Sequence, residues 1–266
     1  MADSALIGFT GFVGGTLLRQ RVFDYRFRST NIQDIQGQSY DLVVCAGAPG
    51  QKWLANQQPE RDKENIARLT AALQGVHAKT FVLLSTVDVF HRPIGIDERT
   101  PVDSSQLQPY GLHRYQLEEF VRDRFEHHLI VRLPGLVGPG LRKNVVYDLS
   151  NENNVARIDP RGKFQFYPTV NLWSDIQNAL AHGLRLIHLT AEPVGVYEIA
   201  RSVFGTELNV PAEAVSRPVA SYDFRSIHAE ALGATGLYYQ YSKRESLLAI
   251  RSYVQSLRLH AEAASE

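Results

Sequence analysis

The chain has 266 residues, of which 44% are hydrophobic and 21% charged, as in ordinary soluble globular proteins. Its 28 basic and 28 acidic residues give a formal net charge of zero, so nothing indicates nucleic acid or an anionic membrane as the main partner. A single cysteine, Cys45, excludes an intrachain disulfide, and no apolar run reaches membrane-spanning length. We therefore expect a cytoplasmic protein.

Short apolar segments alternate with amphipathic ones in the first half of the chain. This pattern predicts an α/β fold, a Rossmann-like doubly wound parallel sheet with helices on both faces. In chain order, strands are expected at residues 5–9, 23–27, 41–48, 80–90 and 128–138, and helices from the opening glycines to about residue 20, at 59–76 and at 110–127. Cys45 falls within the third strand, where we expect a packed and inert thiol.

The pattern becomes polar and irregular beyond residue 150, and it is mixed again at 205–240. We expect a Rossmann domain over residues 1–150, to which 169–200 return, and a small substrate lobe made of 151–168 and 205–240. Helices are expected at 173–184 and 193–205. Residues 241–266 are expected to form a C-terminal helix and a polar tail.

Three glycines, Gly8, Gly11 and Gly14, stand between the first strand and the first helix. In such a unit one glycine allows a tight turn, one lets the backbone approach a pyrophosphate, and one lets the helix pack close to the strand. The helix N-terminus adds free N–H groups and the positive end of its dipole. The turn predicts a dinucleotide site, although a glycine turn that merely packs is the alternative.

The end of the second strand bears on the choice between NAD and NADP. The acidic residue that usually holds the adenosine ribose of NAD is not evident, because Asp24 falls within the expected strand. Arg28 and Ser29 follow the strand instead, and an arginine beside hydroxyl residues suits a 2′-phosphate. NADP is slightly favoured over NAD, with a solvated basic turn as the alternative.

Four stretches in fixed order carry a family resemblance: "GFTGFVGG" at 8–15, "LLSTVDVF" at 83–90, "PYGLHRYQLEEF" at 109–120 and "PGLVGPGLRKN" at 134–144. Together they resemble the extended short-chain dehydrogenase/reductase family, which contains nucleotide-sugar epimerases, dehydratases and reductases. The resemblance covers the chain well to about residue 145. It implies a Rossmann domain that holds NAD(P) and a catalytic set of Ser or Thr, Tyr and Lys.

Carried over by position, the resemblance implies that Thr86 orients the substrate oxygen, with Ser85 as the adjacent alternative, and that Tyr110 is the general acid/base. The family's lysine falls at position 114, which here is Arg114. Because a free tyrosine titrates near ~10, it needs a nearby cation to exchange protons at neutral pH. Arginine keeps the charge, and a spacing of four puts it on the face of Tyr110, but its planar fork is aimed differently from an ammonium. His113, on an adjacent face, is expected at the surface.

The resemblance also implies further contacts. Cofactor contacts are expected at Gly8, Gly11, Phe12, Val13, Gly14, Arg28, Ser29, Ala46, Gly47, Ala48, Asn65 and Pro134. Substrate contacts are expected at Asp88, Arg142, Lys143 and Asn144, and no metal site is expected. The helices at 60–74 and 110–126 would pair across a two-fold axis in a homodimer, where Leu117, Phe120 and Val121 serve either the core or the interface.

Two functional hypotheses follow. The first is an NAD(P)-dependent oxidoreductase or epimerase that acts on a nucleotide-sugar or a similar alcohol or ketone, by hydride transfer with Tyr110 exchanging the hydroxyl proton. The second is a catalytically degenerate NAD(P)-binding sensor or scaffold of the same fold, which Arg114 favours.

Overall fold

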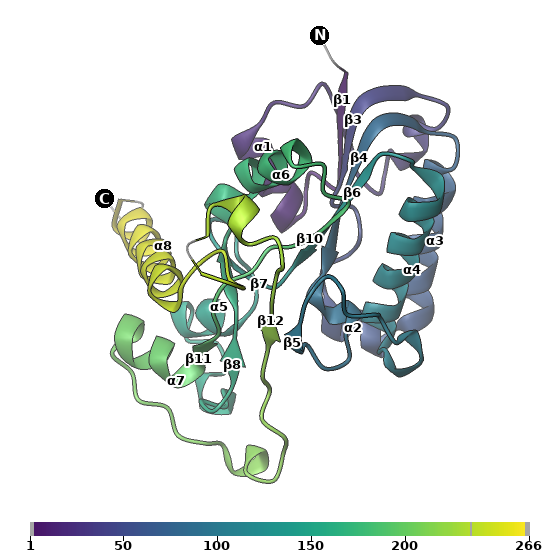
Figure 1. The fold of residues 1–266 in the computed structure, drawn as a ribbon. Helices are drawn as coiled ribbons and strands as arrows, with labels where there is room; N and C mark the ends of the chain where they lie inside the picture. The colour runs from purple at the N-terminus through teal and green to yellow at the C-terminus, as the bar shows by residue number, and fades with distance from the viewer. Residues whose placement is uncertain (1–2, 235, 264–266) are drawn as a thin grey trace. The chain divides into compact units, whose positions relative to one another are not determined.

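The structure is a computed structural model that describes residues 3–234 and 236–263 (Figure 1). The chain divides into two compact units. The first unit contains Met1–Arg92, Glu98–Leu133 and Asn171–His188, and the second contains Pro93–Asp97, Pro134–Val170 and Leu189–Glu266.

A six-stranded parallel sheet forms the centre of the first unit. Its strands are β1 (Ser4–Ile7), β2 (Tyr25–Phe27), β3 (Ser39–Cys45), β4 (His77–Thr86), β6 (His128–Leu133) and β10 (Leu186–His188), in the spatial order β10-β6-β4-β3-β1-β2. The chain leaves β1 toward β2 and then crosses to β3 on the other side of β1. The side on which successive strands are added therefore changes between β1 and β3, while all the strands stay parallel. Open α/β sheets bind ligands at this switch point, beyond the carboxyl ends of the strands.

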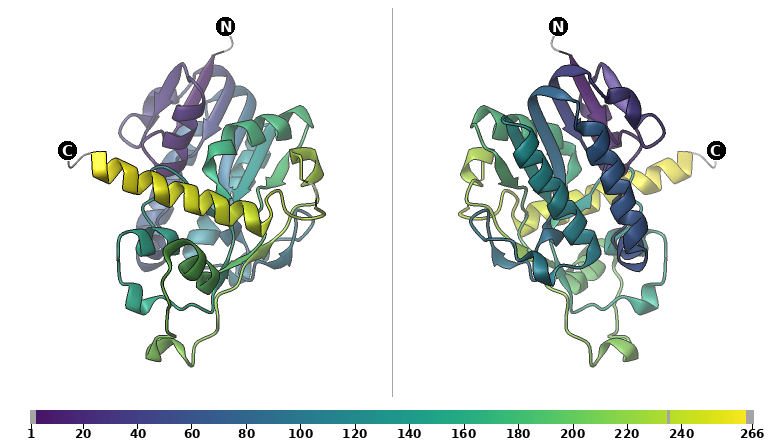
Figure 2. Two further views of the ribbon diagram at one scale, coloured as in Figure 1. Left: turned by 90° about the vertical axis from the view of Figure 1, so that its left-hand side faces the viewer. Right: turned by 90° about the vertical axis from the view of Figure 1, so that its right-hand side faces the viewer.

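Helices cover both faces of this sheet. Helices α1 (Phe12–Gln20) and α6 (Leu172–Ala181) lie on one face, and α3 (Pro59–Leu73) and α4 (Pro109–Arg124) lie on the other (Figures 1 and 2). The short helix α2 (Lys52–Gln57) packs against α3 and α4. The predicted Rossmann-like α/β fold is confirmed. Neither α2 nor β10 is predicted from the sequence, because each is too short to show a period.

The core between the sheet and helices α3 and α4 is apolar. It includes Val43 of β3, Phe81 of β4 and Leu117 and Val121 of α4, with Phe81 stacked on Phe125 at a centroid distance of 4.1 Å. Leu117 and Val121 thus serve the core. Cys45 is fully buried, as expected, and burial raises the pKa of its thiol to about 11, which favours the protonated, unreactive form.

The second unit contains short strands and three helices within its described residues. The strands are β5 (Ile94–Ile96), β7 (Gly135–Val137), β8 (Lys163–Phe164), β9 (Phe166–Pro168), β11 (Val194–Gly195) and β12 (Asp223–Phe224), and the helices are α5 (Val145–Ser150), α7 (Val196–Ile199) and α8 (Lys243–Ala263). A π-helical turn, Ala200–Phe204, continues α7.

The boundary between the units falls at residue 134 rather than at the predicted residue 150. The expected strand at 128–138 is interrupted at Pro134, so it forms two strands. The first, β6, pairs with β4 and β10 in the large sheet, whereas β7 pairs with β9 of the second unit. None of the helices in the described part of the chain combines the length and apolar character that a membrane crossing requires.

Candidate active site

The glycine turn connects β1 to α1 at the point where the sheet reverses. Gly8 has φ of +83°, and a Cβ there would lie 2.3 Å from the carbonyl oxygen of Ala46, at the end of β3. A Cβ on Gly14 would lie 2.1 Å from the carbonyl oxygen of Gly8. Both positions therefore require glycine for the turn itself and for close helix–strand packing.

Gly11 differs from the other two glycines of the turn. It is the exposed N-cap of α1, with φ of −77°, and a Cβ there would meet only the carbonyl oxygen of Gly8, at 3.4 Å. The protein's own packing therefore tolerates a side chain at this position. The N–H groups of Phe12 and Val13 follow in the first turn of α1, where helices leave amides without intrahelical partners. Such a bare helix start fits a pyrophosphate.

Two adjacent glycines in α1 give a test of this packing. Gly14→Ala is expected to lower the free energy of unfolding by about 1–3 kcal/mol, because its methyl group collides with the Gly8 carbonyl. Gly15→Ala is the matched control, since its Cβ would meet Phe9 O at an ordinary 3.7 Å, and it should raise stability by about 0.5–1 kcal/mol. Urea denaturation of both variants checks this. Equal effects of the two substitutions would show that the close approach does not matter.

Asp24 and Arg28 lie at opposite ends of β2. Asp24 precedes the strand, and its carboxylate accepts hydrogen bonds from Ser4 Oγ at 2.7 Å and Ser4 N at 2.9 Å, which hold its pKa below the usual range. Asp24 is thus outside the strand and at the amino end of the sheet. Arg28 and Ser29 follow the carboxyl end of β2, and both side chains are exposed. The Arg28 amide donates to Asn31 Oδ1 at 2.7 Å, which shapes this turn.

The segment after β3 lies beside the glycine turn. The amide of Ala46 donates to Ile7 O at 2.9 Å, and a Cβ on Gly47 would lie 2.9 Å from an Ile7 methyl group. Ala46, Gly47 and Ala48 are half-buried. Asn65, on α3, accepts a hydrogen bond from Arg68 at 2.9 Å. It also borders a depression lined by Pro49, Gln51, Leu54, Ala55, Gln58, Arg61, Asp62 and Asn65.

Ser85 and Thr86 end β4 and, as strand neighbours, point to opposite faces. Ser85 is buried, and its hydroxyl donates to Glu118 Oε1 at 2.6 Å. Thr86 accepts a hydrogen bond from the Asp88 amide at 3.2 Å and also hydrogen-bonds the Tyr110 phenol. Of the two adjacent hydroxyls, Thr86 is therefore the one that meets Tyr110, because Ser85 is held in the interior.

Tyr110 stands in the first turn of α4. Its amide donates to Asn56 Oδ1 of α2 at 3.0 Å, and its side chain is only 8% exposed. A Cβ on Gly111 would lie 2.0 Å from Asp88 O, so only glycine lets the helix start pack against the turn after β4. The pKa of the Tyr110 phenol is raised above its usual value, mainly because the phenol is buried. The nearby Arg114 charge acts to lower the pKa, and the Asp88 charge acts to raise it. The hydrogen bond to Thr86 and the Lys52 charge also act to lower it.

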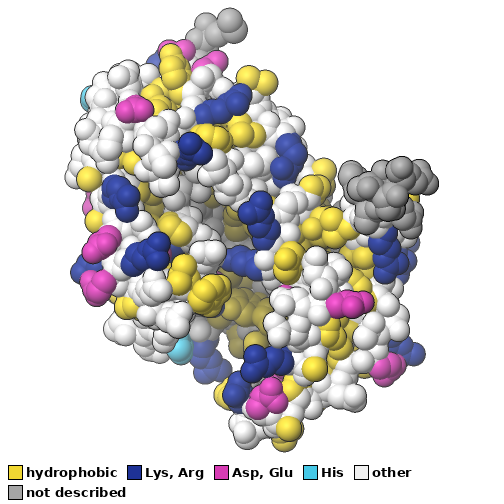
Figure 3. Space-filling model, turned by 180° about the vertical axis from the view of Figure 1, so that it is seen from behind, with side chains coloured by type: hydrophobic (Ala, Val, Ile, Leu, Met, Phe, Trp, Pro, Cys, Tyr) yellow, Lys and Arg dark blue, Asp and Glu magenta, His cyan; other side chains and the backbone are white. Residues whose placement is uncertain are grey.

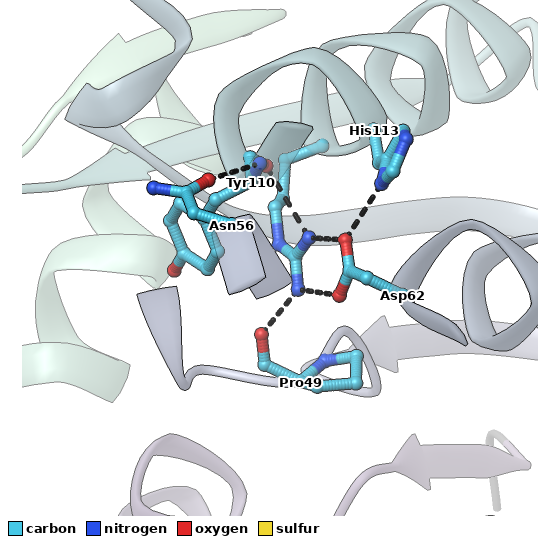
Figure 4. A network of polar contacts seen from close by, with 6 residues as sticks. Pro49, Asn56, Asp62, Tyr110 and His113 are labelled. Atoms are coloured by element: carbon cyan, nitrogen blue, oxygen red, sulfur yellow. Dashed lines mark hydrogen bonds and ion pairs between the residues drawn. The ribbon is translucent and has the colours of Figure 1, made fainter. Parts of the chain in front are cut away.

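Arg114 lies one turn after Tyr110, on the same face, as the spacing predicts. Its guanidinium carbon is 4.1 Å from the centroid of the Tyr110 ring. The guanidinium binds both carboxylate oxygens of Asp62, the Pro49 carbonyl and, at 3.2 Å, the Tyr110 carbonyl (Figure 4). Arg114 is 3% exposed and Asp62 is 5% exposed. The guanidinium is thus paired inside the first unit, between α3, α4 and the segment after β3.

His113 is buried, so the expectation of a surface residue is wrong. Its Nδ1 lies 2.7 Å from Asp62 Oδ2, and both side chains point toward each other in Figure 4. Burial acts to raise the pKa of Asp62, but hydrogen bonds from Arg114 and His113 outweigh this and hold the pKa below its usual range. A buried carboxylate explains why these two polar residues of α4 face inward.

Lys52 is a charged residue of this region that sequence reasoning misses. It begins α2, and its Nζ lies 2.7 Å from Asp88 Oδ1, with the lysine side chain 43% exposed and that of Asp88 19% exposed. The charges of both residues act on the Tyr110 phenol. The only signal in the sequence is a lysine shortly after the third strand, which nothing connects with residue 88.

The remaining predicted residues lie in the second unit. Pro134 follows β6 and is buried, whereas Arg142 and Lys143 are exposed in the loop before α5. Asn144 is the N-cap of α5: its side chain accepts from the amides of Val146 and Tyr147 and donates to Leu136 O. The structure thus gives Asn144 a capping role that the sequence analysis does not anticipate. Among the residues the structure describes, no three His, Cys, Asp or Glu side chains gather as metal ligands would.

The chain matches no protein-family model and no curated protein sequence. Solved structures do match. A dTDP-4-dehydrorhamnose reductase ortholog from Clostridium acetobutylicum is 18% identical, with a TM-score of 0.71, over 96% of this chain and 99% of that chain. RMD from Pseudomonas aeruginosa, complexed with NADPH, is 18% identical, with a TM-score of 0.70, over 96% and 99%. A UDP-galactose 4-epimerase is 16% identical, with a TM-score of 0.72, over 97% and 99%.

These neighbours share the fold across nearly the whole length of both chains. At such identities, the likeness concerns the backbone and not the chemistry. The α/β Rossmann-like fold that the sequence motifs predict is therefore confirmed, and it is the fold that these neighbours share.

Proposed function

We propose that the chain is an NAD(P)-dependent oxidoreductase or epimerase that acts on a nucleotide-linked sugar or a similar alcohol or ketone. The observation that carries the proposal is the contact between Thr86 and the Tyr110 phenol at the carboxyl edge of the parallel sheet. This is the edge to which the glycine turn belongs. A hydroxyl and a phenol together there suit a substrate alcohol or carbonyl, whose oxygen one group orients and the other protonates.

The start of α1 suits the pyrophosphate of a dinucleotide, held by the amides of Phe12 and Val13, whereas the Gly11 amide donates to Gly8 O within the turn at 3.0 Å. When bound, a nicotinamide supplies the donor or acceptor for hydride transfer at a substrate carbon. The chain's own residues then handle the proton. Tyr110 exchanges it with the substrate hydroxyl, and Thr86 orients the substrate oxygen. Arg114 holds its positive charge next to the phenol ring, which favours the phenolate.

NADP is proposed as the preferred cofactor because Arg28 and Ser29 follow β2 where an adenosine ribose would lie. The structural neighbours include an NADPH complex and an NAD-dependent enzyme, which support a nicotinamide cofactor in general. Arg28→Ala is expected to raise the Kd for NADPH by about 10–100-fold, through loss of a charge-assisted contact to the 2′-phosphate, and to leave the Kd for NADH unchanged. Arg26→Ala, which removes another exposed arginine two residues away, is the matched control. Isothermal titration calorimetry measures the Kd values of both variants for NADPH and for NADH. An equal loss of affinity for NADH in Arg28→Ala would contradict the assignment of Arg28 to the 2′-phosphate.

A second candidate is a catalytically degenerate NAD(P)-binding sensor or scaffold. The observation that favours it is the pairing of Arg114 with both oxygens of Asp62, which ties the guanidinium to a structural carboxylate. Cofactor uptake without turnover of any nucleotide-sugar, alcohol or ketone would support this candidate. Absence of uptake of either coenzyme, in both redox forms, would overturn both candidates.

The partner proposals follow from the same evidence. The lysine and arginine side chains are spread in separate groups over the face drawn in Figure 3. With zero formal net charge, this distribution favours a small-molecule substrate over nucleic acid. A homodimer through α3 and α4 stays a prediction, which sedimentation measurements can test.

A further inference from the structure

Three charged groups act on the Tyr110 phenol, and they come from different elements. Arg114 belongs to α4 itself, Asp88 to the turn after β4, and Lys52 to the start of α2. Behind Arg114 stand Asp62 of α3 and His113 of α4. The roles of these groups differ, because each cation has its own counter-ion.

The Arg114 charge is balanced by the buried carboxylate of Asp62, which binds both terminal nitrogens of the guanidinium. Its two terminal nitrogens bind the two oxygens of Asp62, one of them at 2.8 Å, and both also bind backbone carbonyls. Such a pair is fixed, since an arginine does not lose its proton and a buried carboxylate of lowered pKa does not gain one. Arg114 therefore acts as a constant part of the surroundings of the phenol ring.

Lys52 is held differently. Its ammonium lies 2.7 Å from Asp88 Oδ1 at a half-exposed position. Asp88 in turn is anchored to Thr86, because its amide donates to Thr86 Oγ1 at 3.2 Å and the Thr86 hydroxyl donates to Asp88 Oδ2 at 3.5 Å. A continuous chain of contacts thus runs from the Tyr110 phenol through Thr86 and Asp88 to the Lys52 ammonium.

We propose that Lys52, positioned by Asp88, is a further residue of the active site and the cation that tunes proton exchange at Tyr110. The inference rests on the proposed function. Lys52 does not itself exchange a proton with the substrate: it acts through its charge on the phenol of Tyr110. Its charge favours the phenolate, the charge of Asp88 opposes it, and the hydrogen bonds of Asp88 hold the ammonium next to the Thr86 end of the site.

The test is a titration of the phenol that needs neither substrate nor cofactor. In protein labelled with 13C at the tyrosine ζ carbon, the Tyr110 resonance is assigned with Tyr110→Phe and followed with pH. Lys52→Met is expected to move the titration midpoint up by about 0.5–1 pH unit, and Lys52→Arg should restore it. Asp88→Asn is expected to move the midpoint down, because the charge of Asp88 acts on the phenol more strongly than that of Lys52, whose ammonium the substitution also releases.

The opposite signs of the two shifts separate an electrostatic role from a structural one, since damage to the fold would move both variants in one direction. Lys79→Met is the matched control, because Lys79 pairs with Asp41 at the amino end of the same sheet. It should leave the Tyr110 midpoint unchanged. An unchanged midpoint in Lys52→Met, or equal shifts in Lys52→Met and Lys79→Met, would overturn the proposal.

Failure of the proposed function has a different signature. A protein that takes up no nicotinamide coenzyme would lose its proposed activity even if Lys52 moves the Tyr110 midpoint. Conversely, coenzyme uptake and turnover with an unmoved midpoint would remove only Lys52 from the site. In an active enzyme, Lys52→Met should also displace the pH profile of kcat by the shift seen in the titration.

Discussion

Tyr110→Phe is expected to lower the turnover number by about 100- to 10,000-fold, the range over which general acid/base groups contribute. The substitution removes only the hydroxyl, so the ring keeps its contact with the Arg114 guanidinium and its place in the first unit. Coenzyme binding should be unchanged, because the glycine turn is untouched. Steady-state rates with a panel of nucleotide sugars, together with calorimetry of coenzyme binding, measure both quantities.

Tyr115→Phe provides the matched control for this variant. Tyr115 lies in the same helix, and the Arg122 guanidinium carbon is 5.8 Å from its ring centroid. Its hydroxyl has no part in the proposed reaction, so the turnover number should stay within a factor of two or so of the wild-type value. Similar and substantial rates for wild type and Tyr110→Phe would argue against the phenol as the proton donor. Negligible rates for both proteins would favour the sensor hypothesis.

The largest effect on stability is expected at Glu118. This buried carboxylate accepts hydrogen bonds from Arg132 at 3.0 and 2.7 Å, from Arg122 at 2.9 Å and from Ser85 at 2.6 Å. Glu118→Gln keeps the shape but leaves the buried Arg132 charge without its counter-charge. We expect a loss of about 3–5 kcal/mol in the free energy of unfolding, measured by urea denaturation.

The neighbouring residue supplies the control for Glu118. Glu119 is exposed on the same helix, so Glu119→Gln should change stability by no more than about 0.5 kcal/mol. Combining Glu118→Gln with Arg132→Met removes both buried charges and should recover most of the loss. Equal stabilities of the Glu118→Gln and Glu119→Gln variants would mean that the ion pair between Glu118 and Arg132 contributes little to the free energy of unfolding.

Periodic segments account for the part of the fold that the sequence predicts well. The apolar runs at β3 and β4 and the amphipathic segments at α3 and α4 are long enough to show their period, so their positions are correct to within a few residues. The helix expected at 59–76 ends earlier, at Leu73, with Gln74 as its C-cap. Elements of three to six residues, such as β10 and α2, carry no such signal.

The site was predictable only as far as its motifs reach. Thr86, Tyr110 and the glycine turn stand in recognisable order, whereas Asp62 is 52 residues from Arg114 and Lys52 is 36 residues from Asp88. Those pairs exist because α2 and α3 pack beside α4, which is a property of the tertiary fold. The burial of His113 is hidden from the sequence for the same reason, since it depends on the carboxylate of Asp62 across the helix pair.

The burial of Cys45 makes the natural chain a suitable background for site-specific labelling. The Cys45 thiol is buried, and burial raises its pKa to about 11. Such a thiol reacts poorly with maleimides at neutral pH, because the thiolate is the reactive form. Cysteines introduced at exposed positions, one in each unit, would then accept a fluorophore pair without prior removal of Cys45. Energy transfer between the dyes would report in solution whether coenzyme addition changes the distance between the two units.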